Sequence, residues 1–98
     1  MEIKLDALEV INNPAEKRFE LWIDGQLSKL DYTIDDDTIM MTHVGVPNEF
    51  RGQGLAGVIT KAALEYAKEK SLRVIPVCPY VLAYIRRNKQ YLELTRSK

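Results

Sequence analysis

The middle of the chain contains a glycine-rich segment with the residue types of an anion-binding turn. It reads Val46-Pro-Asn-Glu-Phe-Arg-Gly-Gln-Gly-Leu-Ala-Gly57 and leads into an apolar, helix-like pattern. The first turn of a helix has unpaired N–H groups and a partial positive charge. Glycine has no Cβ to keep a phosphate away from those donors. The segment therefore suits a pyrophosphate; the alternative is a glycine-rich turn that binds nothing. The spacing fits neither G-x-G-x-x-G nor G-x-x-x-x-G-K-[ST], which excludes the dinucleotide and P-loop motifs.

Two further side chains could take part in acid–base or nucleophilic chemistry. His43 is the only histidine, and an imidazole can take up or release a proton near neutral pH, so it is a candidate general base. Cys78 is the only cysteine, and a thiolate there could accept an acyl group. The alternatives are a structural histidine and a buried apolar cysteine. One cysteine and one histidine form neither a disulfide within the chain nor a His/Cys metal cluster, so we expect no metal.

The elements that must position these residues can be read from the hydrophobic pattern. Strands are expected over residues 17–23, 26–32 and 38–46, joined by the hairpin signal Asp24-Gly25 and by a polar turn at Asp35-Asp36-Asp37. These strands would form an antiparallel meander. The first sixteen residues are compatible with one strand at 2–5 or with none.

The period of the apolar residues changes to that of a helix over residues 54–70. A short apolar strand at 72–77 could pair with the third strand after this helical crossover. A second, shorter helix follows between Pro79 and Asn88. The sequence thus predicts an α/β (α+β) fold with a mainly antiparallel sheet, a crossover helix and a short C-terminal helix. Residues 1–98 have the length of a single domain.

The glycine-rich segment also contains R-x-x-G-x-A, spelled Arg51-Gly52-Gln53-Gly54-Leu55-Ala56. This resembles the acetyl-CoA-binding signature Q/R-x-x-G-x-G/A of the GNAT superfamily of acetyl-CoA-dependent N-acyltransferases. The flanking stretches are similar to a small single-domain GNAT-like subfamily with a Cys after the fourth strand; they read His43-Val-Gly-Val-Pro47 and Val77-Cys-Pro-Tyr80…Tyr84-Ile-Arg-Arg-Asn88. The resemblance extends roughly from Phe19 to Tyr91 and implies an acyl-CoA N-acyltransferase-like fold.

The resemblance implies how acetyl-CoA would be held. Amides of the signature would bind the pyrophosphate, namely those of Gly52, Gln53, Gly54, Leu55 and Ala56. Backbone groups of Val44 and Val46 would pair with the pantetheine, because the two strands flanking the site splay apart in this superfamily. Arg51 would lie close to the phosphates. Arg86, Arg87 and Lys89 are candidates for the 3′-phosphate, with a solvated helix end as the alternative for each.

The resemblance also implies two catalytic routes. In the small subfamily a cysteine placed like Cys78 lies beside the thioester and could form an acyl-enzyme. In direct transfer an amine attacks the thioester, His43 is a possible base, and Tyr84 could protonate the leaving thiolate as a helix tyrosine does in the superfamily. Relatives often carry Glu (H-T-E-V-P) where this chain has Gly45, so a carboxylate that could act as the base is missing here.

The expected function is that of an acyl-CoA-dependent N-acetyltransferase, which moves an acetyl group from acetyl-CoA to a small amine, a protein lysine or an N-terminus. The alternative is a non-catalytic CoA-binding module. Residues 1–50 carry four basic and eleven acidic side chains (net −7), and residues 51–98 carry ten basic and three acidic ones (net +7). The basic half suits the phosphates of CoA, and the acidic half predicts a cationic acceptor.

Localisation and other partners follow from what the sequence lacks. The first twenty residues are interrupted by acids, and the longest apolar run contains Pro76 and Pro79, so neither a signal peptide nor a membrane span is expected. There is no helix-turn-helix signal and no aromatic-interleaved basic motif, so nucleic acid is not expected as a partner. We therefore expect a cytoplasmic protein.

Overall fold

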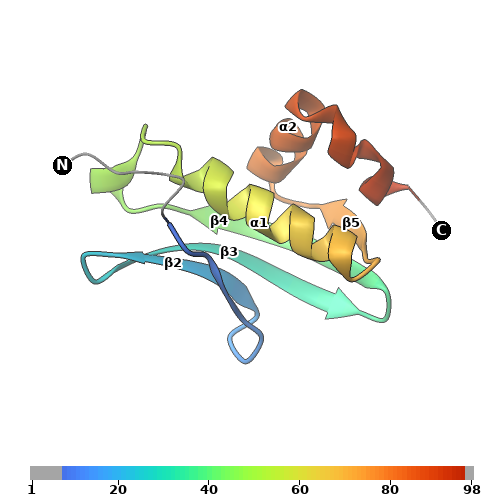
Figure 1. Cartoon of the computed structure of the whole chain (residues 1–98), viewed down its shortest axis with the longest axis horizontal. Coiled ribbons are helices and arrows are strands. Elements are labelled where there is room, and N and C mark those ends of the chain that lie inside the picture. Colours follow the sequence, from blue (N-terminus) through green and yellow to red (C-terminus); the bar gives the residue numbers. More distant parts are fainter. Residues whose placement is uncertain (1–7, 97–98) are drawn as a thin grey trace.

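Five strands form one sheet in the order β1-β2-β3-β4-β5 in the computed structural model, which describes residues 8–96. The strands are β1 (Ile11–Asn13), β2 (Arg18–Ile23), β3 (Gln26–Asp35), β4 (Thr38–Gly45) and β5 (Arg73–Pro76). β1 to β4 are antiparallel neighbours, and β5 runs parallel to β4. Helices α1 (Leu55–Glu69) and α2 (Pro79–Arg87) lie on the same side of the sheet (Figure 1). This arrangement confirms the predicted fold class.

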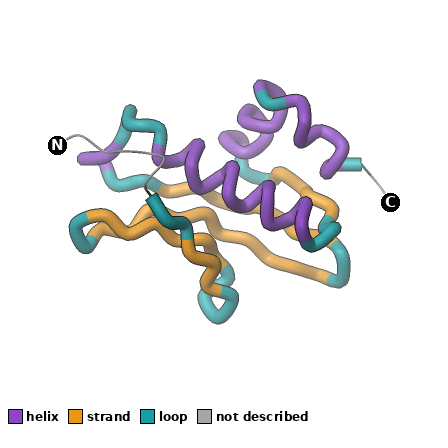
Figure 2. The backbone as a smooth tube through the Cα atoms, in the orientation of Figure 1, coloured by secondary structure: helices purple, strands orange, loops and turns teal. Residues whose placement is uncertain are grey.

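Short 3₁₀ helices precede α1 and follow α2, as the tube in Figure 2 shows. They are η2 (Asn48–Phe50) and η3 (Lys89–Thr95). η3 was not expected from the sequence. It closes the C-terminal part of the described chain, and its Tyr91 side chain is buried at 3% exposure.

Most strand boundaries agree with the sequence pattern, with two differences. β3 continues to Asp35 because Ile34 and Asp35 pair with Ile39 and Thr38 of β4, so the polar turn is shorter than expected. β1 was not predicted because a three-residue strand of sequence Ile-Asn-Asn has no alternation to reveal it. The strand considered at residues 2–5 lies outside the described residues.

The core forms between α1 and the sheet. The buried side of α1 consists of Leu55, Ile59, Thr60, Ala63, Leu64 and Ala67. It faces buried strand residues including Phe19, Leu21, Leu30, Ile39 and Met41. Each large apolar side chain buried in this way stabilises the fold by about 1.5–3 kcal/mol. The crossover helix is therefore fixed on the sheet by the apolar period that predicted it.

β5 pairs over its whole length with the first half of β4 alone. Their partners run from Thr38 and Arg73 to Met41 and Pro76, after which the Cys78 N–H donates to the Met41 carbonyl at 2.9 Å. At the same point the register between β3 and β4 shifts by one residue, so that Thr42 is an extra residue in β4. A bulge bends the strand that carries it. Beyond Met41, β4 is paired with β3 alone, and its other edge is open.

Candidate functional site

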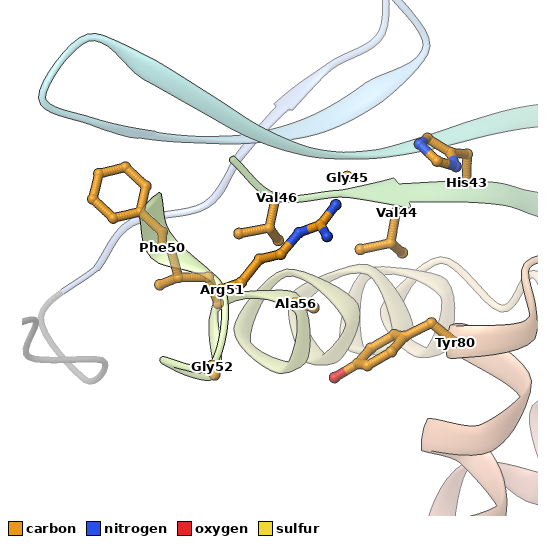
Figure 3. Close-up of a pocket in the computed structure, with 11 residues that line it drawn as sticks. His43, Val44, Gly45, Val46, Phe50, Arg51, Gly52, Ala56 and Tyr80 are labelled. Carbon is orange, nitrogen blue, oxygen red and sulfur yellow. The ribbon is translucent and has the colours of Figure 1, made fainter. Parts of the chain in front are cut away.

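A cavity of about 430 Å³ lies beside the open end of β4. It is bounded by β4, by the loop that leads into α1, and by the first turn of α2 (Figure 3). The lining residues are His43, Val44, Gly45, Val46, Phe50, Arg51, Gly52, Gly54, Leu55, Ala56 and Tyr80. The divergence of β4 from β5 therefore makes room for a ligand between strand backbone and helix N-terminus.

The loop on one side of the cavity is held in a defined shape. Phe50 is buried, and its N–H donates to the Pro47 carbonyl at 2.9 Å, while the Arg51 N–H donates to the Asn48 carbonyl at 3.2 Å. Gly52 and Gly54 then adopt φ of 82° and 83°, in the left-handed region that favours glycine. These two residues turn the chain sharply from the anchored Phe50 into α1.

The first turn of α1 is suited to bind an anion. Gly54 is the N-cap residue, so no side chain caps the helix there, and the first turn contains no acidic residue. Its N–H groups have a partial positive charge. Among the described residues that line the cavity, Arg51 is the one Lys, Arg, Asp or Glu, and its side chain extends toward Val46 and Val44 (Figure 3). The cavity is therefore electrostatically favourable for phosphate.

His43 lies at the edge of the cavity and is exposed. A Cβ built at Gly45 would be 3.3 Å from His43 Nε2, so the imidazole occupies the space beside the bare backbone of Gly45. The strand neighbour of His43 is Asp31, whose carboxylate pairs with Lys29 at 3.2 Å. The glycine that removes a carboxylate from this position therefore also gives the imidazole room to lie over β4.

The structure brings most of the predicted site residues together. His43 and Val44 of β4, the following Val46, Arg51 and four of the five signature residues line the same cavity. Gln53 belongs to the same loop but does not line it. The residue roles themselves stay predictions, since no ligand is bound.

Five further candidates lie outside the lining, namely Cys78, Tyr84, Arg86, Arg87 and Lys89. Cys78 is 6% exposed, lies in the hydrophobic core, and is the N-cap residue of α2, which favours the packing alternative for its thiol. Tyr84 lies one turn beyond the cavity. Arg86 and Arg87 are exposed in the last turn of α2, about 10 Å along the helix from the turn that reaches the cavity.

Two lining side chains were missed by sequence reasoning, namely Phe50 and Tyr80. Tyr80 is in the first turn of α2, and its hydroxyl would lie 3.5 Å from a Cβ at Gly57 of α1. A glycine inside a helical pattern often marks a close approach of another element. Gly57 was therefore the one signal in the sequence that a side chain packs against this turn of α1.

The comparison with known families agrees with this geometry. The family model described as GCN5-related N-acetyl-transferase matches residues 18–94. The chain belongs to this family, as the resemblance of its glycine-rich signature predicted.

Individual relatives share between 28% and 38% of their residues with this chain over the matched regions. Protein NATD1 of Xenopus tropicalis is 38% identical over 58 residues, which cover 57% of this chain and 53% of that protein. Protein NATD1 of Danio rerio is 28% identical over 91 residues, covering 88% and 83%. The chain thus spans about half the length of most of the curated relatives it matches. The solution structure of a GCN5-like protein from Staphylococcus aureus has a TM-score of 0.70 at 28% identity and covers 89% of this chain and 86% of its own.

Residues 8–96 contain neither a metal-binding cluster nor a membrane-spanning helix. No group of three or more His, Cys, Asp and Glu side chains in this range is arranged to hold a metal ion. In the same range no helix has the length and hydropathy needed to cross a bilayer.

Proposed function

We propose that this chain transfers an acetyl group from acetyl-CoA to an amine. The observation that carries the proposal is the cavity between the open edge of β4 and the glycine-rich start of α1, in a member of the GCN5-related N-acetyltransferase family. The pyrophosphate would bind the amides of residues 52–56. The pantetheine would lie along Val44 of β4 and the following Val46, beyond Met41, where pairing with β5 ends and backbone groups could bond its amides.

The chemistry we propose is direct transfer. The amine nitrogen attacks the thioester carbon, the nitrogen loses a proton to His43, and the C–S bond breaks to release CoA as a thiolate. The Tyr80 hydroxyl then donates a proton to the thiolate and takes up a proton from water. His43 releases to water the proton that it took from the amine. His43 and Tyr80 are the lining side chains able to exchange protons in this way.

A non-catalytic CoA-binding module is the second candidate. It is favoured by one observation: among residues 8–96, neither position 45 nor any other residue of the cavity lining has a carboxylate. Both candidates require CoA binding, and they differ in turnover alone.

Titration calorimetry with acetyl-CoA tests what the two candidates share, and release of free CoA with a panel of amines tests what separates them. We expect binding and amine-dependent release. Binding without release with any amine supports the module, and no binding at millimolar ligand rules out both.

The role of His43 is tested by His43→Gln. General-base catalysis contributes about 100-fold or more to kcat, so we expect a loss of that size with unchanged acetyl-CoA affinity. Unchanged turnover in this variant would mean that the base lies elsewhere.

The acyl-enzyme route through Cys78 has its own test. The thiol is buried in the core, so we expect Cys78→Ala to keep turnover, with a loss of stability from the smaller side chain. The mass of the intact protein after incubation with acetyl-CoA should show no hydroxylamine-sensitive adduct. An adduct that disappears in Cys78→Ala would establish the covalent route instead.

A further inference from the structure

Three tyrosine rings form a row between α1, α2 and η3. The ring centroids of Tyr80 and Tyr84 are 6.4 Å apart with planes inclined by 33°, and those of Tyr84 and Tyr91 are 6.3 Å apart with planes inclined by 30°. Aromatic pairs at such separations attract each other beyond the area they bury. The first ring of the row lines the cavity, and the last lies in η3.

Both ends of the row contact α1. At the cavity end, a Cβ at Gly57 would lie 3.5 Å from the Tyr80 hydroxyl and 3.7 Å from the Tyr84 ring. At the other end, the Tyr91 hydroxyl donates to Glu65 Oε2 at 2.7 Å. Gly57 and Glu65 are eight residues apart on α1, a rise of about 12 Å, which matches the two ring spacings. The row therefore runs alongside α1 with a contact at each end.

The far end of the row is well fixed. Tyr91 is 3% exposed, and its bond to a carboxylate is of the stronger, charge-assisted kind. Tyr84 is held at its backbone, where its carbonyl accepts bonds from the side chain and the N–H of Asn88, both at 2.9 Å. Tyr80, by contrast, has no hydrogen bond from its hydroxyl within residues 8–96. The direction of its ring is therefore set by the Tyr84 ring behind it and by the bare surface of Gly57.

We infer that Glu65, Tyr91 and Tyr84 are positioning residues that hold the Tyr80 ring in the cavity. The inference rests on the proposed function, because Tyr80 acts there on the thioester end of acetyl-CoA. Loss of the Tyr91 hydroxyl would remove the hydrogen bond that ties η3 to Glu65 of α1, allow the Tyr91 and Tyr84 rings to shift, and give the Tyr80 ring access to other rotamers. A small displacement of a group that acts on the reacting atoms is costly for turnover.

Tyr91→Phe tests this arrangement, with Tyr32→Phe as its matched control. Tyr32 is also a buried tyrosine, and its hydroxyl donates to Asn12 Oδ1 at 2.6 Å, at a place on the sheet outside the cavity lining. Each variant removes one buried hydroxyl and keeps its ring. We expect Tyr91→Phe to lower kcat about fivefold to tenfold with unchanged acetyl-CoA affinity, and Tyr32→Phe to leave kcat unchanged.

Glu65→Gln and Glu69→Gln form a second matched pair on α1. Each removes one negative charge, but only Glu65→Gln replaces the charge-assisted bond from the Tyr91 hydroxyl by a weaker bond to an amide oxygen. We expect the loss of kcat in Glu65→Gln and not in Glu69→Gln. If kcat is the same in Tyr91→Phe as in Tyr32→Phe, and the same in Glu65→Gln as in Glu69→Gln, the inference is wrong.

A measurement without turnover keeps this test separate from the proposed function. NMR spectra of ring-labelled tyrosine should show the Tyr80 resonances shifted in Tyr91→Phe and Glu65→Gln, and unshifted in Tyr32→Phe and Glu69→Gln. This result would support the row even if no amine were acetylated. If the Tyr80 resonances are unshifted in Tyr91→Phe and Glu65→Gln, the row does not position Tyr80, even if the enzyme is active.

Discussion

At the scale of single residues, the two tyrosines of α2 lie one helical turn apart, and only one of them reaches the cavity. Tyr80 lines the cavity, and Tyr84 packs behind it with its pKa raised by burial and by the nearby Tyr80. We expect Tyr80→Phe to reduce kcat by about 100-fold, the cost of one donor to a developing negative charge. Tyr84→Phe keeps its ring and should cost far less.

The measurement is steady-state turnover of acetyl-CoA with the best amine, together with acetyl-CoA affinity as the check on folding and binding. Equal losses in the two variants would contradict the assignment. A larger loss in Tyr84→Phe would restore the role that the sequence suggested for that residue.

The Tyr91 hydroxyl predicts a pH dependence of stability. Burial and then the hydrogen bond to Glu65 raise the pKa of Tyr91 to about 12, against about 10 for an exposed tyrosine. A pKa raised by folding means that the protonated form is favoured in the folded state. Its contribution to stability is therefore complete below about pH 10 and is lost as the pH rises through about 12.

Urea unfolding at neutral pH and near pH 11 measures this effect, with tyrosinate absorbance reporting ionisation. We expect the wild type to lose more stability at alkaline pH than Tyr91→Phe. Identical losses in the two proteins would contradict the origin proposed for the effect.

At the scale of elements, two glycines at the start of α1 have opposite requirements, namely the N-cap residue Gly54 and Gly57 within the helix. Gly54 caps the helix at φ 83°, where a Cβ costs roughly 1–2 kcal/mol. Gly57 lies within α1, and a Cβ there would make ordinary contacts of 3.5 and 3.7 Å. Alanine is the better helix former by about 1 kcal/mol. We expect Gly54→Ala to destabilise the protein and Gly57→Ala to stabilise it by about that amount.

Thermal and urea unfolding of the two variants tests the difference in sign. Gly54→Ala should also weaken CoA binding, because its methyl group stands beside the N–H groups proposed to bind the pyrophosphate. A Gly54→Ala protein with full stability and full CoA affinity would contradict both the turn and the proposed binding mode.

At the scale of the whole molecule, the two charged halves of the sequence meet at the cavity. Arg51 faces the cavity from the basic half, whereas the polar turn at Asp36-Asp37 lies at the far end of β4, about 25 Å from Gly45. Two acids on the neighbouring strands already have partners, since Glu20 pairs with Arg18 and Asp31 with Lys29. The preference for a cationic acceptor stays a prediction, and we expect it to be weak.

CoA binding, by contrast, should depend on salt. Raising ionic strength from about 0.1 M to about 1 M shortens the screening length from about 10 Å to about 3 Å, so we expect the affinity for CoA to fall. Arg51→Gln should weaken binding and reduce the salt dependence. If Arg86 or Arg87 meets the 3′-phosphate, its replacement by Gln weakens CoA binding but not that of dephospho-CoA. An affinity independent of salt would contradict the electrostatic part of the proposal.

Much of the fold was determined by local sequence. The turn at Asp24-Gly25, the change of apolar period at Gly54 and the β-branched run of β4 each specify one element without reference to the rest of the chain. β1 and η3 escaped prediction because three residues of strand and one short 3₁₀ segment are specified by what they pack against. The hydroxyls of Tyr32 and Tyr91, for example, donate to Asn12 and Glu65, which are 20 and 26 residues away in the sequence.

The candidate site, like the fold, was predictable only where it depends on consecutive residues. The shape of the glycine-rich turn was predictable because positive φ, glycine and a helix start are properties of consecutive residues, here Gly52 to Ala56. Which tyrosine reaches the cavity, and whether the thiol of Cys78 does, depend on the phase of α2 and on where β5 leaves β4. Those are distances between elements, which packing sets. The sequence by itself thus determined the family and the glycine-rich loop proposed to bind the donor, and only the tertiary structure decided which side chains surround the cavity.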